Sequence, residues 1–97
     1  MRRLGVPTIP IERQCKAETK QFEPPKYPSV AARANIQGWV VLHFDLDGSG
    51  HATSIVVERS SPIGIFDQVA IDALRGAQFV EGAKRTACET LVGFTIR

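Results

Sequence analysis

The chain has 97 residues, which is enough for one compact domain and too few for two. With 43% hydrophobic and 23% charged residues it resembles a folded globule rather than a disordered tail. Its net charge of +2 is far from the lysine and arginine clusters that bind phosphate backbones, so we expect no nucleic-acid partner. No apolar run reaches the roughly 18 residues of a membrane span, and residues 1–10 do not read as a secretory signal. A soluble piece of a longer membrane-anchored protein remains compatible with this sequence.

The beginning of the chain is expected to be a lead-in rather than a packed element. Five of the six prolines lie there: Pro7, Pro10, Pro24, Pro25 and Pro28. Proline fixes φ and donates no amide hydrogen, which disfavours both helices and strands. We therefore divide the chain into a linker-like segment, residues 1–21, and a globular domain, residues 22–97.

Two helices are predicted. A short one follows Pro28, with Ser29 as its N-cap, an alanine-rich body and Gly38 as its terminator. A longer one covers residues 66–77, where Asp67 complements the helix dipole and Gly76 marks the end. Its apolar residues recur at helical spacing and form one face: Phe66, Val69, Ala70, Ala73, Leu74 and Ala77.

Three strands are predicted. The clearest covers residues 39–46, in which an apolar set alternates with a mixed set. The apolar set should face the core, and the other face should be open or only partly covered. Residues 47–50 supply the glycines of a hairpin turn, and residues 52–59 form the returning strand. Residues 89–97 form the last strand.

These elements predict an α+β fold, a two-layer sandwich with both helices on one face of a three-stranded antiparallel sheet. A right-handed crossover through residues 66–77 places the last strand beside the first. The strand order is therefore 2-1-3, and the last strand lies at an edge of the sheet.

Cys15 and Cys88 are the only cysteines. They have no metal-like spacing to His43 or His51, so no metal site is expected. Two interpretations remain: one disulfide closing a loop of about 70 residues, or two separate buried thiols. We favour the disulfide, which would indicate an oxidising compartment.

The sequence predicts no enzyme. Neither histidine adjoins a serine or cysteine nucleophile, and no glycine-rich turn opens a helix to hold phosphate. Residues 45–50 match the start of a calcium loop, but Val56 stands where such a loop needs a bidentate glutamate. We therefore expect no catalytic residue, no cofactor and no metal.

The last strand is a candidate docking edge. Residues 90–96 would expose unpaired N–H and C=O groups, protected only by Glu89 and Arg97 at the ends. An extended peptide can pair with such an edge by strand addition. About five new hydrogen bonds contribute roughly 3–7 kcal/mol, whereas association costs about 4–15 kcal/mol, so side-chain contacts must supplement them. The alternatives are that the N-terminal segment covers the edge, or that the edge pairs with its twin in a homodimer.

A series of short motifs follows one order through residues 24–96. They are Pro25-Lys26-Tyr27-Pro28 before the alanine-rich helix, Gly38-Trp39-Val40-Val41-Leu42-His43-Phe44, the hairpin Asp47-Gly48-Ser49-Gly50, Ser60-Ser61-Pro62, and Phe66-Asp67 with Ala70 and Ala73. In this order they resemble the TonB C-terminal domain family. The chain departs from that family at Phe79-Val80-Glu81, which lacks the proline of the family's Y-x-P, and in its cysteine pair.

The resemblance implies the periplasmic domain of an energy transducer that is anchored in the inner membrane. Such transducers couple the proton-motive force, harvested by an ExbB–ExbD complex, to outer-membrane receptors that import iron-siderophores, haem or cobalamin. A short receptor segment, the TonB box, docks on the last strand. The binding residues that the resemblance implies are Pro25, Tyr27, Pro28, Leu91, Val92, Gly93, Phe94, Thr95 and Ile96. Two related classes remain as alternatives: a TolA-like envelope scaffold, and a TonB-like module of a sensor or signalling protein.

Overall fold

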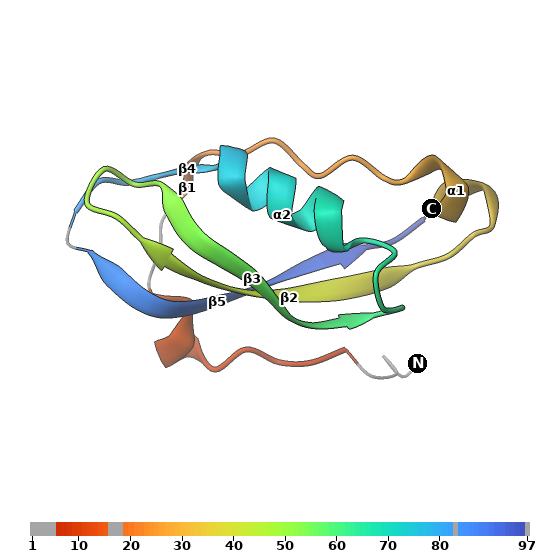
Figure 1. Cartoon of the computed structure of the whole chain (residues 1–97), viewed down its shortest axis with the longest axis horizontal. Coiled ribbons are helices and arrows are strands. Elements are labelled where there is room, and N and C mark those ends of the chain that lie inside the picture. Colours follow the sequence, from red (N-terminus) through yellow and green to blue (C-terminus); the bar gives the residue numbers. More distant parts are fainter. Residues whose placement is uncertain (1–5, 16–18, 83, 97) are drawn as a thin grey trace.

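The computed structural model describes residues 6–15, 19–82 and 84–96 (Figure 1). No helix within these residues is both long enough and apolar enough to cross a membrane. In chain order the elements are a 3-10 helix η1 (Ile11–Gln14), β1 (Thr19–Gln21), α1 (Ser29–Arg33), β2 (Gly38–Leu46), β3 (Ala52–Ser61), α2 (Asp67–Gly76), β4 (Gln78–Phe79) and β5 (Arg85–Phe94).

The main sheet has three antiparallel strands in the order β3-β2-β5, with α2 lying across one face (Figure 1). The predicted α+β fold class and strand order are therefore confirmed. The last strand begins earlier than predicted, at Arg85, because a bulge interrupts its alternation. Thr86 and Ala87 together oppose Asp45, whose carboxylate accepts the freed N–H of Ala87 at 3.0 Å.

The core lies between the sheet and α2. The apolar set of β2 faces it as predicted, and Val40, Leu42 and Phe44 are buried there. An aromatic cluster closes one end of the core: the rings of Phe66 and Phe94 stack with centroids 4.4 Å apart. Tyr27 meets both rings edge-on, at 5.5 Å and 5.9 Å.

The helix ends differ from the predicted ones. Ser29 is the first residue of α1 rather than its cap, and the Pro28 carbonyl accepts the first helical hydrogen bond. The helix stops at Arg33, and Asn35 follows in a left-handed conformation (φ 55°). Gly38 does not end the helix but begins β2, where a Cβ would lie 2.1 Å from the Ser61 carbonyl oxygen. The sequence pattern missed that this glycine serves strand packing.

Residues 6–10 run along the side of the main sheet opposite α2 (Figure 1). Ile9 in this segment is buried, and Val41, on the sheet face away from α2, is fully buried. The face that was expected to be open or only partly covered is therefore partly covered, at Val41. Residues 19–21 also have regular structure, because β1 pairs antiparallel with β4 in a small second sheet that the sequence pattern did not predict. The domain boundary between residues 21 and 22 stays a prediction.

Candidate peptide-binding edge

Strand β5 is an edge of the main sheet. It pairs with β2 on one side. Among residues 6–15, 19–82 and 84–96, no backbone hydrogen bond reaches its other side. The N-terminal segment lies close to this edge but does not add a strand to it. Peptide N–H and C=O groups on the outer side of β5 are therefore available to a partner strand.

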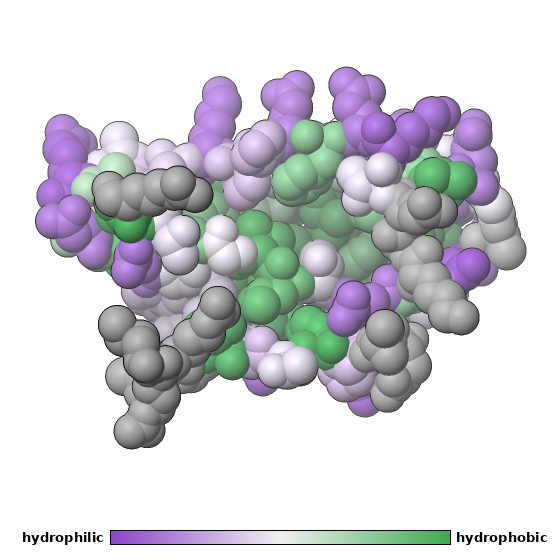
Figure 2. All heavy atoms as spheres, turned by 180° about the vertical axis from the view of Figure 1, so that it is seen from behind, coloured by the Kyte–Doolittle hydropathy of each residue, from purple (hydrophilic) through white to green (hydrophobic). Residues whose placement is uncertain are grey.

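A groove of about 740 Å³ follows this edge. Figure 2 views the molecule from behind, and apolar atoms gather there in a hollow below a rim of polar atoms. The groove has three parts. Its floor is made by β5 residues and core side chains, its first wall by the N-terminal segment, and its second wall by residues before α1. In that order the lining residues are Glu89, Thr90, Leu91, Val92, Gly93, Phe44, Leu74 and Phe79; Val6, Pro7, Thr8, Ile9 and Gln14; and Thr19, Phe22 and Pro25.

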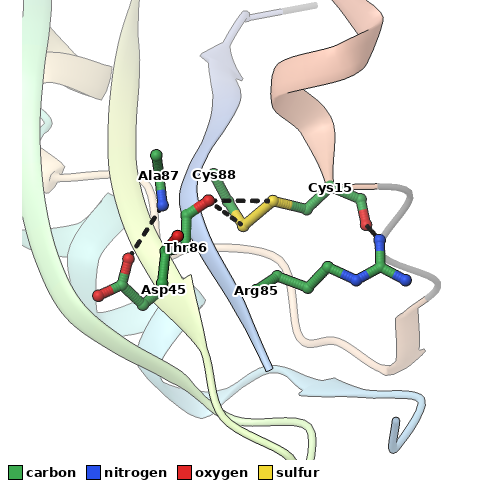
Figure 3. Close-up of a disulfide and its surroundings, with 6 residues drawn as sticks. All are labelled: Cys15, Asp45, Arg85, Thr86, Ala87 and Cys88. Atoms are coloured by element: carbon green, nitrogen blue, oxygen red, sulfur yellow. Dashed lines mark hydrogen bonds between the residues drawn. A yellow bond between two sulfur atoms is a disulfide. The ribbon is translucent and has the colours of Figure 1, made fainter. Parts of the chain in front are cut away.

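A disulfide bond links the N-terminal segment, which forms the first wall, to β5, which forms the floor. Cys15, directly after η1, is bonded to Cys88 in β5, with their Cα atoms 5.5 Å apart (Figure 3). The guanidinium of Arg85 donates a hydrogen bond to the Cys15 carbonyl beside this bond (Figure 3). One residue earlier in the wall, the side-chain amide of Gln14 donates a hydrogen bond to the Ile9 carbonyl at 3.0 Å. The N-terminal segment is thus tied to β5 covalently and braced along its length.

Glu89 brings a charge into the floor of the groove. Although it lies in the middle of β5, it is only 4% exposed. Nη1 of Arg13 in η1 donates to its carboxylate at 3.3 Å, which adds an ion pair between the wall and the floor. The sequence analysis placed Glu89 at the end of the strand as a protecting charge, but in the structure it is an interior, buried and paired residue.

A second carboxylate lies beside Glu89. Glu58 belongs to a bulge of β3, between the residues that pair with Val41 and Leu42 of β2. A hydrogen bond with Glu89 and desolvation raise the pKa of Glu58 above its ordinary value of 4.5, and charge repulsion from Glu89 acts in the same direction. Arg59 and His43 oppose this rise in pKa. Glu58 and Glu89 therefore place two carboxylates side by side on the sheet, with the guanidinium groups of Arg13 and Arg59 near them.

The structure brings together only some of the residues implied by the family resemblance. Pro25, Leu91, Val92 and Gly93 line the groove. The other five lie outside its lining. They are Tyr27, half-buried against the core with its hydroxyl donating to the Ile36 carbonyl, Pro28 at the start of α1, Phe94 buried against Phe66, and Thr95 and Ile96 beyond the end of β5. A binding role for any of the nine stays a prediction.

Sequence reasoning left the first wall as an alternative, in which the N-terminal segment covers the edge, and did not identify the residues that form it. A proline-rich stretch has no periodicity, so nothing in residues 6–9 signals that they pack against a sheet edge. The one available signal was the cysteine pair, since a bond between Cys15 and Cys88 requires the lead-in to lie beside the last strand. Phe22 in the second wall gave a weaker signal, as an aromatic residue within an otherwise polar stretch.

Within the described ranges, no group of three or more histidine, cysteine or acidic side chains is arranged to hold a metal ion. The arrangement instead defines a class of protein: a small α+β domain that presents one unpaired sheet edge in an apolar groove.

Residues 23–96 match the family model described as "Gram-negative bacterial TonB protein C-terminal". The chain therefore belongs to the TonB C-terminal domain family, whose members are energy transducers rather than enzymes. The resemblance seen in the order of the sequence motifs is confirmed. The match begins at residue 23, so the first wall of the groove lies outside it.

Two curated relatives are the TonB proteins of Xanthomonas campestris pv. campestris strains B100 and ATCC 33913. Each is 44% identical to this chain over 61 residues, which are 63% of this chain and 27% of the relative. The chain thus spans about a quarter of the length of these relatives.

Solved structures agree with the observed fold. The solution NMR structure of the Pseudomonas aeruginosa TonB C-terminal domain matches with a TM-score of 0.72 and 27% identity, covering 84% of this chain and 87% of that one. The TonB2 protein of Vibrio anguillarum matches with a TM-score of 0.69 over the whole chain and 95% of its own. At 23% identity, this second likeness speaks for the fold alone.

Proposed function

We propose that this chain is the periplasmic receptor-binding domain of a TonB-type transducer, and that it binds the TonB box of an outer-membrane receptor by strand addition on β5. The observation that carries the proposal is the unpaired outer edge of β5 within a groove of about 740 Å³. Family membership supports the same partner, because residues 23–96 match the TonB C-terminal model.

The groove supplies what backbone pairing lacks. About five hydrogen bonds at roughly 0.5–1.5 kcal/mol each do not reliably exceed the cost of association. Apolar side chains on both sides of β5 add contact area, among them Leu91, Phe22 and Phe79. Affinity then depends on the side chains of the bound segment as well as on its backbone.

The remaining parts of the proposal concern the whole transducer. An inner-membrane anchor and an ExbB–ExbD partner would deliver the proton-motive force, and the receptor would import an iron-siderophore, haem or cobalamin. The cysteine pair supports the periplasm as the location, because disulfides persist in that oxidising compartment.

Titration of the isotopically labelled chain with a TonB-box peptide, followed by NMR, tests the docking site. We expect the amide signals of residues 90–93 to shift on binding, because these residues would gain backbone partners. The free edge of β3 (Ala52–Ser61) serves as an internal control and should stay unchanged. Shifts confined to β3, or no binding, would contradict the proposal.

A substitution at Gly93 tests the same site without disturbing the core. A Cβ at Gly93 meets open space, so Gly93→Arg should fold normally while its side chain obstructs the groove. We expect the peptide to bind about tenfold more weakly, a loss of about 1.4 kcal/mol. Gly76→Arg is the matched control, since its Cβ also meets open space and it lies outside the groove. Equal affinity of the two variants would place the binding site elsewhere.

A further inference from the structure

We propose that residues 6–15 form a specificity wall of the peptide groove, held in place by the Cys15–Cys88 disulfide, and that this wall selects a segment with apolar side chains on both faces of its strand. The inference rests on the proposed function and deepens it. It concerns residues that lie outside the part of the chain matched by the family model, which begins at residue 23.

Much of the groove lining comes from residues near the start of the chain. Five of its lining residues come from the N-terminal segment: Val6, Pro7, Thr8, Ile9 and Gln14. Thr19 and Phe22, in the second wall, also precede the family match. Without these residues β5 would be a bare edge; with them it becomes the floor of a channel. The extra residues therefore change what can bind, while the fold of residues 23–96 supplies the edge itself.

A disulfide, an ion pair and a hydrogen bond hold the wall in place. The disulfide joins the end of the segment to Cys88, a fully buried residue of β5. The Arg13–Glu89 ion pair at 3.3 Å acts one residue further along the same strand. The Gln14–Ile9 hydrogen bond then folds the segment back from η1 toward the groove. A wall fixed before binding loses less conformational freedom when the peptide docks, which favours affinity.

The side chains that line the groove indicate which peptide segment it can bind. Side chains of an added strand point alternately to the two faces of the sheet. One row would meet the first wall around Val6 and Ile9, and the other row would meet Phe22 and Phe79. Among the lining residues that the structure describes, Glu89 is the only charged one, and it is already paired with Arg13. Both rows therefore favour apolar or small side chains, and a charge in either row would lose its hydration without gaining a partner.

The test compares peptide affinities of wall variants by calorimetry. Intact mass measured without reductant first establishes that the wild-type chain carries the disulfide; two alkylatable thiols would end the proposal at once. Val6→Asp places a charge in the wall, and we expect TonB-box peptide to bind about tenfold more weakly. Val80→Asp is the matched control, an exposed valine outside the groove, and should bind like the wild type.

A second variant releases the wall. Cys15→Ala/Cys88→Ala should bind the TonB-box peptide about tenfold more weakly than the wild type does. Replacing one apolar residue of the peptide with aspartate should lower its affinity less for this variant than for the wild type. If the double variant does not fold, Val6→Asp decides the question alone, because it changes a partly exposed side chain.

The possible outcomes separate this inference from the proposed function. Wild-type binding with unchanged affinity in both wall variants would overturn the wall and leave docking on β5 intact. Absence of binding to the wild type would overturn both. Weakening in Val6→Asp but not in Val80→Asp, together with a smaller aspartate penalty in the released variant, would support the wall.

Discussion

Among single residues, Glu58 links the stability of the folded chain to pH through its contact with Glu89. The pKa of Glu58 is raised by its hydrogen bond with Glu89, by desolvation and by repulsion between the two carboxylates. An acid with a raised pKa binds its proton more tightly in the folded than in the unfolded chain. This contribution to stability is present at low pH and is lost as the pH rises from about 4.5 through the folded-state pKa.

Glu58→Gln should therefore flatten the dependence of stability on pH. We expect the wild type to lose stability relative to this variant as the pH rises from about 4 to about 7, because only the wild type then carries two adjacent carboxylates. Urea unfolding at several pH values measures the difference. In Glu89→Gln, NMR titration should show a lower pKa for Glu58 than in the wild type. Parallel stability curves for Glu58→Gln and the wild type would refute this account.

The faces of side chains could be predicted residue by residue where alternation was regular. The pattern placed Leu42 and Phe44 toward the core, and both are buried there. Glu89 was wrongly expected to be a protecting charge at the strand end, because a pattern of polarity does not reveal the cation that pairs with a buried carboxylate. That cation, Arg13, lies 76 residues away in the sequence. Burial of a charge depends on such a distant partner, which local sequence does not encode.

Among the elements, the hairpin between β2 and β3 shows how a short turn supports a second sheet. The Asp47 carboxylate accepts hydrogen bonds from the backbone N–H groups of His51 (2.9 Å) and Ser49 (3.0 Å). Hydrogen bonds to this carboxylate, of which the bond from His51 has the largest effect, lower the pKa of Asp47. Gly50 adopts φ +91° and its carbonyl accepts the N–H of Phe79 in β4 at 2.8 Å. The turn therefore also positions the floor of the groove at Phe79.

The two glycines of this hairpin should respond differently to alanine. A Cβ at Gly50 would lie 2.2 Å from the Phe79 carbonyl oxygen, in a backbone conformation that disfavours side chains. We expect Gly50→Ala to lower the free energy of unfolding by about 2 kcal/mol or more. Gly48→Ala is the matched control, because its nearest neighbour would be 3.4 Å away and the loss should stay below about 1 kcal/mol. Urea denaturation compares them, and equal losses would show that Gly50 is not needed for its backbone conformation.

The longer elements and the short helix α1 were predictable, and the two shortest strands were not. β2 and α2 each hold a clear period for about ten residues, and the sequence located both. β1 and β4 have three and two residues, too few for any period to show. The bulge at Ala87 (φ 57°) breaks the alternation of β5 and hid its first four residues. Element length and regularity, rather than stability, decided what the sequence revealed.

Over the whole molecule, the disulfide links two segments covalently that lie far apart in the sequence. It joins residues 73 apart, and a loop of this size stabilises a folded chain by about 4 kcal/mol in the chain-entropy account. A domain of this length is marginally stable from core burial alone, so this contribution is a large share of its total.

Cys15→Ala/Cys88→Ala should therefore lower the free energy of unfolding by about 4 kcal/mol, with little change in the fold of the sheet. Urea unfolding followed by circular dichroism measures the loss. Wild-type protein unfolded with reductant present serves as a control and should approach the double variant. A double variant with the wild-type midpoint would mean that the bond adds nothing to stability.

The global topology followed from the order of elements, because a right-handed crossover leaves one position for the last strand. The candidate site followed only in part. The open edge of β5 could be predicted, but the wall beside it is made by a proline-rich segment without periodicity. Contacts that join the first residues of a chain to its last strand leave almost no local trace.

The bond between Cys15 and Cys88 would also direct any mechanical tension that acts on the chain before Cys15. Such tension would pass through this covalent bond into β5, and the residues between the two cysteines would carry little of it. A receptor segment paired with β5 would then be pulled directly by the strand next to it, and the helices and the other strands would carry little of the load.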